Sequence, residues 1–385
     1  MSRREKDFAA HHHSVQPDYL TWYKYRMNVK TDPDTVSLMS SGLATAWRDI
    51  SPVVASDDAL AALFDTPNPW GLPRLLDALA KRYLVKVEQV LPAQGATNAL
   101  YLACRSLLEP GDHVLVESPG YEPLWMTPTA CGAIVGRFHR DPAGRLDLEA
   151  LTAEMRPDTR LVILTNPHNP SGVWTDRLVM KNVYRTVKRC NPTAMLLVDE
   201  IYGEAVEPRP ESAVHLGDDV LAISSLTKVF GMSCLRCGWL LGPAAAVDRI
   251  RKLQVLVDGI GSNYLEALAT RVINDLDRHR TGALAVMAAN REIMVTSTRR
   301  LMEKELVSGM VPDFGCIYFP AIIDCPSSLT LSSYLETRWK LFTVPGEFFA
   351  MPGHLRIGLG GDSAHLEVGL ERLEQGLVAF RANRG

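Results

Sequence analysis

The feature that most constrains the fold is a series of short apolar runs that recur along the chain at long intervals. Each run is apolar throughout rather than alternating, which is typical of strands covered on both faces. Helical stretches separate the runs, as in a parallel sheet with helical crossovers. The sequence therefore predicts an α/β protein. The predicted strands are residues 113–116, 134–135, 161–164, 195–198, 220–223 and 239–241.

The chain changes character after the last of these runs. It becomes mostly helical, and strand candidates at residues 317–320 and 355–359 lie between and before helices. This order is typical of a smaller α+β domain. We therefore predict a large domain at residues 46–275 and a small C-terminal domain at 276–385. We expect the N-terminal arm, residues 1–45, to join the small domain.

Composition narrows the class of protein. The net charge of -3 and the 46% apolar content are ordinary for a globular enzyme and favour neither nucleic acid nor a membrane as partner. No run approaches the roughly 18 apolar residues of a membrane span, and the polar stretch 1–13 has no apolar core of a secretory signal. The seven cysteines are too few and too scattered for a disulfide framework, so we expect reduced thiols and a cytoplasmic location.

One cysteine pair, Cys234 and Cys237, has C-x-x-C spacing. A zinc site would need a second ligand pair, and none follows at ligand spacing, so we expect no metal. A redox role for this pair stays open as the weaker alternative.

Lys228 follows the predicted strand 220–223 directly, in Ser225-Leu226-Thr227-Lys228. Ligands of open parallel sheets bind beyond the carboxyl ends of the strands. A lysine buried there is suited to attack a carbonyl, because burial lowers the pKa of the ammonium group. A solvated surface lysine is the alternative, and the residues that follow the other strands argue against it.

A candidate anion site lies upstream. Gly95, Ala96 and Thr97 begin a predicted helix, where free backbone N–H groups and the helix dipole attract an anion. Ser225 and Arg236 can add hydrogen bonds to the same anion. An ordinary helix cap is the alternative for the first three residues.

Other strand ends supply complementary groups. Asp199, which could instead cap a helix, can pair with a ring nitrogen. Asn169 and Tyr202 can hold a ring oxygen, and Tyr121 can stack on a ring face unless it simply fills a turn. With the anion site and the Lys228 amine, these groups fit one ligand, pyridoxal 5'-phosphate.

With these residues taken together, the chain resembles the class I/II aminotransferase family, the fold-type I pyridoxal-phosphate enzymes. The resemblance runs from about residue 40 to the C-terminus. The resemblance implies a mostly parallel sheet sandwiched by helices, a smaller α+β domain and a homodimer. The matching motifs are Gly95-Ala96-Thr97, Pro119-Gly120-Tyr121, Asn169-Pro170-Ser171-Gly172, Asp199-Glu200-Ile201-Tyr202, Ser225-Leu226-Thr227-Lys228 with Arg236, and Leu355-Arg356-Ile357.

The resemblance implies a role for each matched residue. Lys228 matches the lysine that forms a Schiff base with the cofactor and later moves a proton. Asp199 matches the carboxylate that keeps the pyridine nitrogen protonated. Arg356 matches the arginine that binds the substrate α-carboxylate, with Gly42 and Asn169 close by. The matched cofactor contacts are Tyr121 for the ring face, Tyr202 and Asn169 for the ring oxygen, and Gly95, Ala96, Thr97, Ser225 and Arg236 for the phosphate.

The chain departs from the family at several positions. Thr66 replaces a tyrosine that often reaches the phosphate of the partner subunit. Trp70 lies nearby, at either the mouth of the site or an interface. Cys234 replaces a glycine, so its backbone must avoid positive φ. His168, just before Asn169, is a weaker candidate for a pocket residue.

The substrate stays open at this stage. The first hypothesis is an aminotransferase acting on an L-amino acid and a 2-oxo acid. The second is another reaction with the same cofactor: cyclisation, β- or γ-elimination, replacement or oxidation. No second arginine for a distal carboxylate is evident in residues 256–263, and the aromatic residues Tyr19, Trp22, Tyr23 and Tyr25 serve either substrate binding or packing of the arm. The chain shows neither the DNA-binding segment expected of a non-catalytic regulator nor the glycine-rich βαβ motif expected of a nicotinamide dehydrogenase.

Overall fold

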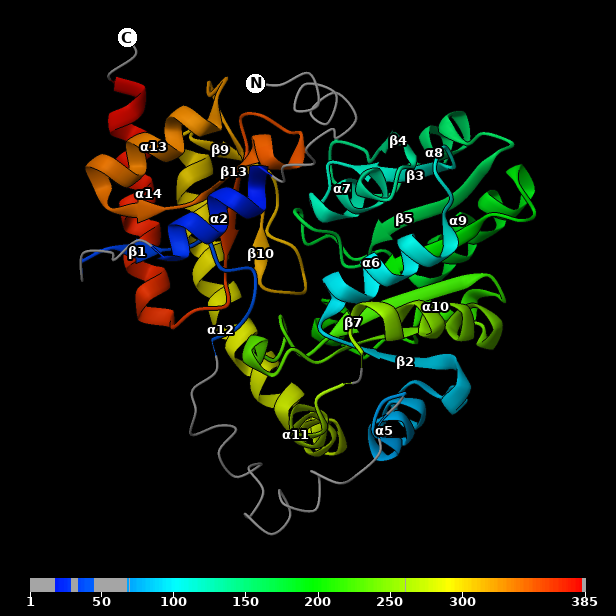
Figure 1. Cartoon of the computed structure of the whole chain (residues 1–385). Coiled ribbons are helices and arrows are strands. Elements are labelled where there is room, and N and C mark those ends of the chain that lie inside the picture. The colour runs from blue at the N-terminus through cyan, green and yellow to red at the C-terminus, as the bar shows by residue number, and fades with distance from the viewer. Residues whose placement is uncertain (1–17, 29–33, 45–67, 69, 260, 383–385) are drawn as a thin grey trace, which may run out of the picture.

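The computed structural model describes residues 18–28, 34–44, 68, 70–259 and 261–382. A twisted sheet with helices on both faces forms the larger lobe, and smaller sheets packed against α2, α12, α13 and α14 form the second lobe (Figure 1). The predicted α/β class, a mostly parallel sheet with a smaller α+β region, is confirmed.

The main sheet has seven strands in the order β2-β8-β7-β6-β5-β3-β4. Strands β3 to β7 are parallel to their neighbours in this group, and β8 is antiparallel to both β2 and β7. The strands are β2 (Val90–Ala93), β3 (His113–Ser118), β4 (Ile134–His139), β5 (Thr159–Thr165), β6 (Met195–Asp199), β7 (Val220–Ser225) and β8 (Gly238–Leu241).

The edge formed by β8 and β2 differs from the prediction. The sequence analysis placed 239–241 among the parallel strands and had no strand at 90–93. No α-helix separates β7 from β8, and a parallel pair needs such a crossover. The chain therefore returns antiparallel, and β2, which contains Pro92, closes the edge.

The apolar runs are explained by burial on both faces. In β5, Leu161 and Ile163 pack in one core cluster, whereas Val162 and Leu164 pack in another on the opposite face. Successive strand residues point to opposite faces, so a strand covered on both sides must be apolar at every position.

The helices connect and cover these strands. α5 shows the expected amphipathic pattern, because Leu75, Leu76 and Leu79 are buried along one side. The helices are α2 (Asp18–Asn28), α5 (Pro73–Tyr83), α6 (Ala96–Leu107), α7 (Pro123–Ala130), α8 (Leu148–Glu154), α9 (Arg177–Cys190), α10 (Ala244–Val257), α11 (Asn263–Asn274), α12 (Leu276–Glu303), α13 (Ser328–Trp339) and α14 (Ser363–Ala382).

The smaller lobe contains short strands. β14 lies between β10 and β13, β11 pairs with β9, and the N-terminal strand β1 pairs with β12. The N-terminal segment therefore contributes to this lobe. The strands are β1 (Val36–Ser37), β9 (Val307–Ser308), β10 (Ile317–Tyr318), β11 (Ala321–Ile322), β12 (Leu341–Phe342), β13 (Val344–Pro345) and β14 (Leu355–Gly358). The exact domain limits stay a prediction, since residues 45–67 lie outside the described part.

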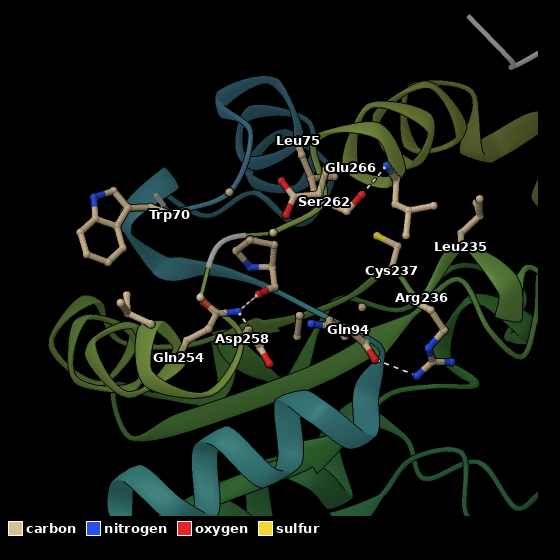
Figure 2. A pocket seen from close by; sticks show the side chains of 18 residues that line it. Trp70, Leu75, Gln94, Leu235, Arg236, Cys237, Gln254, Asp258, Ser262 and Glu266 are labelled. Atoms are coloured by element: carbon tan, nitrogen blue, oxygen red, sulfur yellow. Dashed lines mark hydrogen bonds between the residues drawn. The ribbon is translucent and has the colours of Figure 1, made fainter. Parts of the chain in front are cut away.

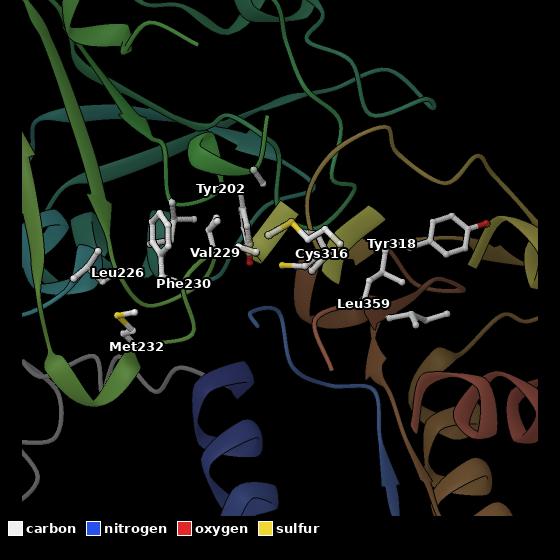
Figure 3. Packing of buried hydrophobic residues seen from close by; sticks show 14 of the residues in the cluster. Tyr202, Leu226, Val229, Phe230, Met232, Cys316, Tyr318 and Leu359 are labelled. Atoms are coloured by element: carbon white, nitrogen blue, oxygen red, sulfur yellow. The ribbon is translucent and has the colours of Figure 1, made fainter. Parts of the chain in front are cut away.

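One core cluster joins the two lobes. It contains Leu226, Val229, Phe230 and Met232 from the segment that follows β7, together with Cys316, Tyr318 and Leu359 of the smaller lobe. Tyr202 lies between these two groups in Figure 3. The segment that carries Lys228 is therefore backed by a shared apolar core. Among the described residues, no helix is long and apolar enough to cross a membrane.

The N-terminal segment packs tightly against β14, which gives a test of the fold. A Cβ at Gly358 would overlap the carbonyl oxygen of Ser40, whereas a Cβ at Gly361 meets nothing within 4 Å. We expect Gly358→Ala to lower the free energy of unfolding by about 1–3 kcal/mol, because backbone atoms must shift. Urea unfolding measures this, and Gly361→Ala is the matched control. Equal midpoints for the two variants would contradict the packing.

Candidate functional site

The sheet places several predicted residues at one edge. Asp199 ends β6 and Ser225 ends β7, and Asp199 pairs in register with Ile223 of β7 and with Thr165 of β5. Lys228 lies three residues after Ser225, in the loop that follows β7. This is the carboxyl edge of the parallel strands, where ligands of open sheets bind.

The amine of Lys228 is buried. Its Nζ donates a hydrogen bond to Ser41 Oγ at 3.0 Å. Burial, with the nearby charge of Arg356 adding to it, lowers the pKa of Lys228 to about 8. Gly42 lies against this lysine, since a Cβ there would come within 3.1 Å of the Lys228 Cα. A larger fraction of this amine is therefore neutral near neutral pH than for an exposed lysine.

Ser41 is a residue that the sequence analysis missed. Besides accepting from Lys228 through its hydroxyl, its carbonyl oxygen accepts from the Tyr202 hydroxyl at 2.9 Å and from Cys316 Sγ at 3.4 Å. It thus contacts Lys228, Tyr202 and Cys316, which come from three separate segments. A serine before Gly42 belongs to none of the quoted motifs, so only the tertiary structure reveals its position.

Asp199 is a buried carboxylate without a cation bonded to it. Its Oδ1 accepts from the Ile201 amide at 3.0 Å, and no salt bridge to it is found among the described residues. Burial is the largest influence and raises the pKa of Asp199 to about 7, with the charge of Glu117 acting in the same direction. A cationic ring nitrogen at this carboxylate would favour its ionised form.

Arg356, in β14, is a buried cation without a bonded carboxylate among the described residues. Its guanidinium is buried, and its bonds go to neutral oxygens: Asn169 Oδ1 at 3.3 Å, the Tyr19 hydroxyl at 2.8 Å and Met39 O at 3.3 Å. Its Nε has no hydrogen-bond partner. No carboxylate among the described residues pairs with this cation, and a buried cation of this kind is suited to an anionic ligand.

The start of α6 forms the other end of the site. Gly95 is its N-cap with φ 92°, and a Cβ on Gly95 would lie 2.8 Å from Arg236 Nη2. Gly238, the register partner of Ser225, lies against this cap, since its Cβ would lie 2.8 Å from the Ala96 nitrogen. The N–H groups of α6 and the Arg236 guanidinium thus lie close together, beside Ser225, as an anion site requires.

Arg236 lies beside a pocket of about 260 Å³. Its Nη2 donates to Gln94 O at 2.8 Å, which Figure 2 marks with a dashed line. Arg236 itself has the left-handed φ of 47°. Cys234 lies in the 3-10 helix Ser233–Leu235, as expected for a residue that must avoid positive φ.

The remaining predicted residues differ in their surroundings. Asn169 is bonded to Arg356 and Tyr202 to Ser41. Tyr121 contacts Tyr19 edge to face, with ring centroids 5.9 Å apart. Thr97 is exposed in the first turn of α6.

Thr66 and Trp70 are the two residues expected near the cross-subunit contact. Thr66 lies outside the described residues. Trp70 lines the pocket beside Arg236 and is 46% exposed. Both interpretations of Trp70, the mouth of the site or an interface, stay open.

His168 is held in the protein interior. Its Nδ1 is 2.7 Å from Ser171 Oγ and its Nε2 is 2.9 Å from Pro119 O. Burial lowers the pKa of His168 well below its usual value. With both nitrogens engaged, this side chain orients the loop that carries Asn169.

A buried ion pair supports the same loop. Arg140 donates to Glu117 Oε2 through Nε and Nη2, at 2.8 and 2.6 Å, and to Thr165 O. Glu117 Oε1 accepts from the Thr165 amide at 2.7 Å. This network joins the ends of β3, β4 and β5 and lies close enough to influence Asp199, an effect that sequence patterns did not indicate.

Other parts of the described chain offer no competing metal or disulfide site. No group of three or more His, Cys, Asp or Glu residues is arranged to hold a metal ion in these residues. Cys234 and Cys237 are free thiols, the first exposed and the second buried.

The residues fit pyridoxal 5'-phosphate. Asp199 offers a carboxylate for a ring cation, and Lys228 offers an amine with a lowered pKa. The start of α6 with Arg236 offers donors for a phosphate.

Comparison with known proteins identifies the family. A family model for aminotransferase class I and II matches residues 49–373. The chain is 30% identical to capreomycidine synthase of Streptomyces vinaceus, over 88% of this chain and 87% of that protein. It is 26% identical to an arginine–pyruvate transaminase of Pseudomonas aeruginosa, over 80% and 82% of the two chains.

A solved structure of the PLP-dependent cyclase OrfR is also similar. It has a TM-score of 0.83 and 25% identity, and the match covers 95% of this chain and 97% of that one. The fold-type I architecture and the use of pyridoxal 5'-phosphate agree with these similarities. The chain belongs to the class I and II aminotransferase family and uses pyridoxal 5'-phosphate.

Proposed function

We propose that this enzyme is an aminotransferase that takes the amino group of an L-amino acid and passes it to a 2-oxo acid. Lys228 is the residue that holds the cofactor covalently as a Schiff base. The observation that carries the proposal is a pair of buried groups around this lysine that form no ion pair with another described residue: the Asp199 carboxylate and the Arg356 guanidinium.

The cofactor contacts follow from the same arrangement. Asp199 would hold the ring nitrogen, Tyr202 and Asn169 the ring oxygen, and Tyr121 the ring face. The phosphate would be held by Gly95, Ala96, Thr97, Ser225 and Arg236. When bound, the cofactor supplies an electron sink for the electrons of the broken bond at Cα.

Arg356 and Asn169 bind and orient the substrate. A planar guanidinium binds a carboxylate through two parallel hydrogen bonds, which fixes the direction in which Cα faces. Asn169 Oδ1 accepts from Arg356 Nη1 and so restrains the guanidinium. Gly42 leaves room at this point, since its backbone lies directly against Lys228.

Lys228 moves the proton at Cα. An amine whose pKa is about 8 is partly neutral at physiological pH and can accept a proton, and a positioned general base typically contributes about 10²–10⁴-fold to the rate. Ser41 Oγ, which accepts from Nζ, gives the amine a defined position whenever it is not covalently bonded. Tyr202, bonded to the same serine, keeps this segment in place.

A second reaction class is supported by the relatives. One of them is named capreomycidine synthase and a structural neighbour is named a cyclase. The same cofactor contacts and the same Lys228 base serve a cyclisation, elimination, replacement or oxidation equally well, since these reactions also begin at Cα. The alternative is therefore a specialised reaction of an amino acid that does not transfer its nitrogen to a 2-oxo acid.

We also propose a homodimer. Large apolar side chains are exposed around the pocket beside Arg236, and Leu256 is 83% exposed. Several large exposed apolar side chains in one part of the chain favour an interface, and members of the resembled family build their site at one. These side chains are Trp70, Val255, Leu256, Val257 and Tyr264. A cytoplasmic location, favoured by the cysteine usage, stays a prediction.

Product analysis tests the reaction. Purified, cofactor-loaded enzyme is incubated with a panel of amino acids, each with a 2-oxo acid present, and products are identified by mass spectrometry. Transamination predicts the 2-oxo acid of the donor and conversion of the cofactor to its amine form. A cyclic or nitrogen-retaining product, or ammonia without that conversion, favours the alternative. Full turnover by Lys228→Ala would contradict both.

The lowered pKa of Lys228 predicts unusual reactivity in cofactor-free protein. Only the neutral amine is acylated, so labelling of Lys228 should rise with pH through a midpoint near 8 rather than near the usual value of about 10.4. Peptide mass spectrometry measures this labelling. The labelling of exposed Lys181 in the same digest is the reference for changes in reagent reactivity with pH. A midpoint above pH 10 would show that the amine is not desolvated.

Sedimentation velocity tests the dimer. We expect a two-chain species at micromolar concentration, and Leu256→Glu should shift it toward the monomer because the substitution places a charge in the apolar interface. Leu178→Glu, at an exposed leucine of α9 in a different part of the lobe, is the control. A monomeric wild type with full activity would count against the dimer.

A further inference from the structure

Helix α2 brings a tyrosine into the substrate end of the site. Tyr19 is 3% exposed although it lies in the first turn of a helix near the N-terminus. Its hydroxyl oxygen accepts a hydrogen bond from Arg356 Nη2 at 2.8 Å. Its ring contacts Tyr121, the residue expected on the cofactor face. Tyr19 therefore lies between the carboxylate-binding arginine and the ring-binding tyrosine.

The hydrogen bonds around Arg356 leave several donors unused. Nη2 donates to the Tyr19 hydroxyl and to Met39 O, and Nη1 donates to Asn169 Oδ1. Nε–H has no partner. A hydroxyl that accepts one bond still carries a proton to donate, and the Tyr19 proton has no acceptor among the described residues. Unused donors at one buried cation suit an anionic ligand.

Tyr19 is held in this position from the larger lobe. Glu122 accepts from the backbone amides of Tyr19 at 3.0 Å and Leu20 at 3.1 Å, one with each carboxylate oxygen. A carboxylate at a helix start satisfies free N–H groups and complements the helix dipole. Glu122 directly follows Tyr121 in the chain, so the cap and the ring-binding residue come from the same turn.

The rings of Tyr19 and Trp22 pack on the smaller lobe. The Tyr19 ring lies 5.8 Å from Phe348 and 5.7 Å from Phe349, and Trp22 lies 5.0 Å from Phe348. These contacts and the Glu122 cap attach α2 to both lobes. Two attachments on different elements restrict the helix, which places the Tyr19 hydroxyl within hydrogen-bond reach of Arg356.

We propose that Tyr19 is a further substrate-binding residue, whose hydroxyl donates a hydrogen bond to the α-carboxylate bound by Arg356, and that Glu122 positions it by capping α2. This inference rests on the proposed function, because it takes Arg356 as the carboxylate site. The sequence left two roles open for the N-terminal aromatic residues. Tyr19 serves substrate binding, while Trp22 packs against Phe348.

Binding of an unreactive carboxylate tests the proposal without turnover. The probe is 3-phenylpropionate, titrated into cofactor-loaded protein in a calorimeter. Hydrogen bonds to charged groups are among the strong ones, so Tyr19→Phe should weaken binding about tenfold or more. Tyr23→Phe removes a hydroxyl from the next turn of α2 that has no bond to Arg356, and it should leave binding unchanged.

The role of Glu122 is tested with a double-mutant cycle that combines Glu122→Gln and Tyr19→Phe. Glu122→Gln should weaken probe binding in the wild-type background, because an amide oxygen replaces only part of the carboxylate cap. In the Tyr19→Phe background it should have no further effect, since Glu122 acts through the Tyr19 hydroxyl. Additive effects would mean that Glu122 has only a general structural role and would overturn its assignment.

The outcomes separate this inference from the proposed function. If wild type binds no probe, or if Arg356→Met binds it as wild type does, the carboxylate site itself is wrong and both proposals fail. If Arg356→Met loses binding while Tyr19→Phe stays within twofold of wild type, the proposed function stands and the role of Tyr19 is overturned. A tenfold loss in Tyr19→Phe with intact Tyr23→Phe supports it.

Discussion

The site depends on a short extended segment, residues 38–44, that is hydrogen-bonded to both lobes. Gly358 N donates to Leu38 O at 2.7 Å on the side of the smaller lobe, and Leu43 N donates to Lys228 O at 2.9 Å on the side of the sheet. Between these anchors the segment presents the Ser41 hydroxyl to the Lys228 amine. Main-chain bonds of this kind allow little adjustment, and the glycines at 42 and 358 permit the close approach.

Burial then gives the site its electrostatic character. Asp199, Lys228 and Arg356 are all removed from water, and none forms an ion pair with another described residue. Desolvation penalises each charged form, which raises the pKa of Asp199 and lowers that of Lys228. A site of this kind costs stability when empty of compensating charges. A cofactor with a ring cation and a phosphate, together with a substrate carboxylate, would supply the complementary charges.

Most of the site was predictable because its residues follow strands. Asp199, Ser225 and Lys228 are adjacent to apolar runs that are easy to recognise, and the topology of a parallel sheet brings such positions to one edge. The antiparallel edge at β8 was not predicted, because an apolar run does not reveal strand direction. Ser41 and Tyr19 were not assigned roles either. Neither follows a strand of the main sheet. The bond of Ser41 to Lys228 spans 187 positions and that of Tyr19 to Arg356 spans 337.

The sequence by itself determined the α/β class, the cofactor and the identity of the residues at the strand ends. These depend on local patterns, namely apolar runs covered on both faces and short motifs whose chemistry requires particular side chains. Only the tertiary structure decided which groups surround the lysine and the arginine. The hydroxyls of Ser41 and Tyr19 and the cap from Glu122 depend on how the N-terminal segment lies between the lobes. That position results from long-range packing and backbone hydrogen bonds, which leave no periodic trace in the sequence.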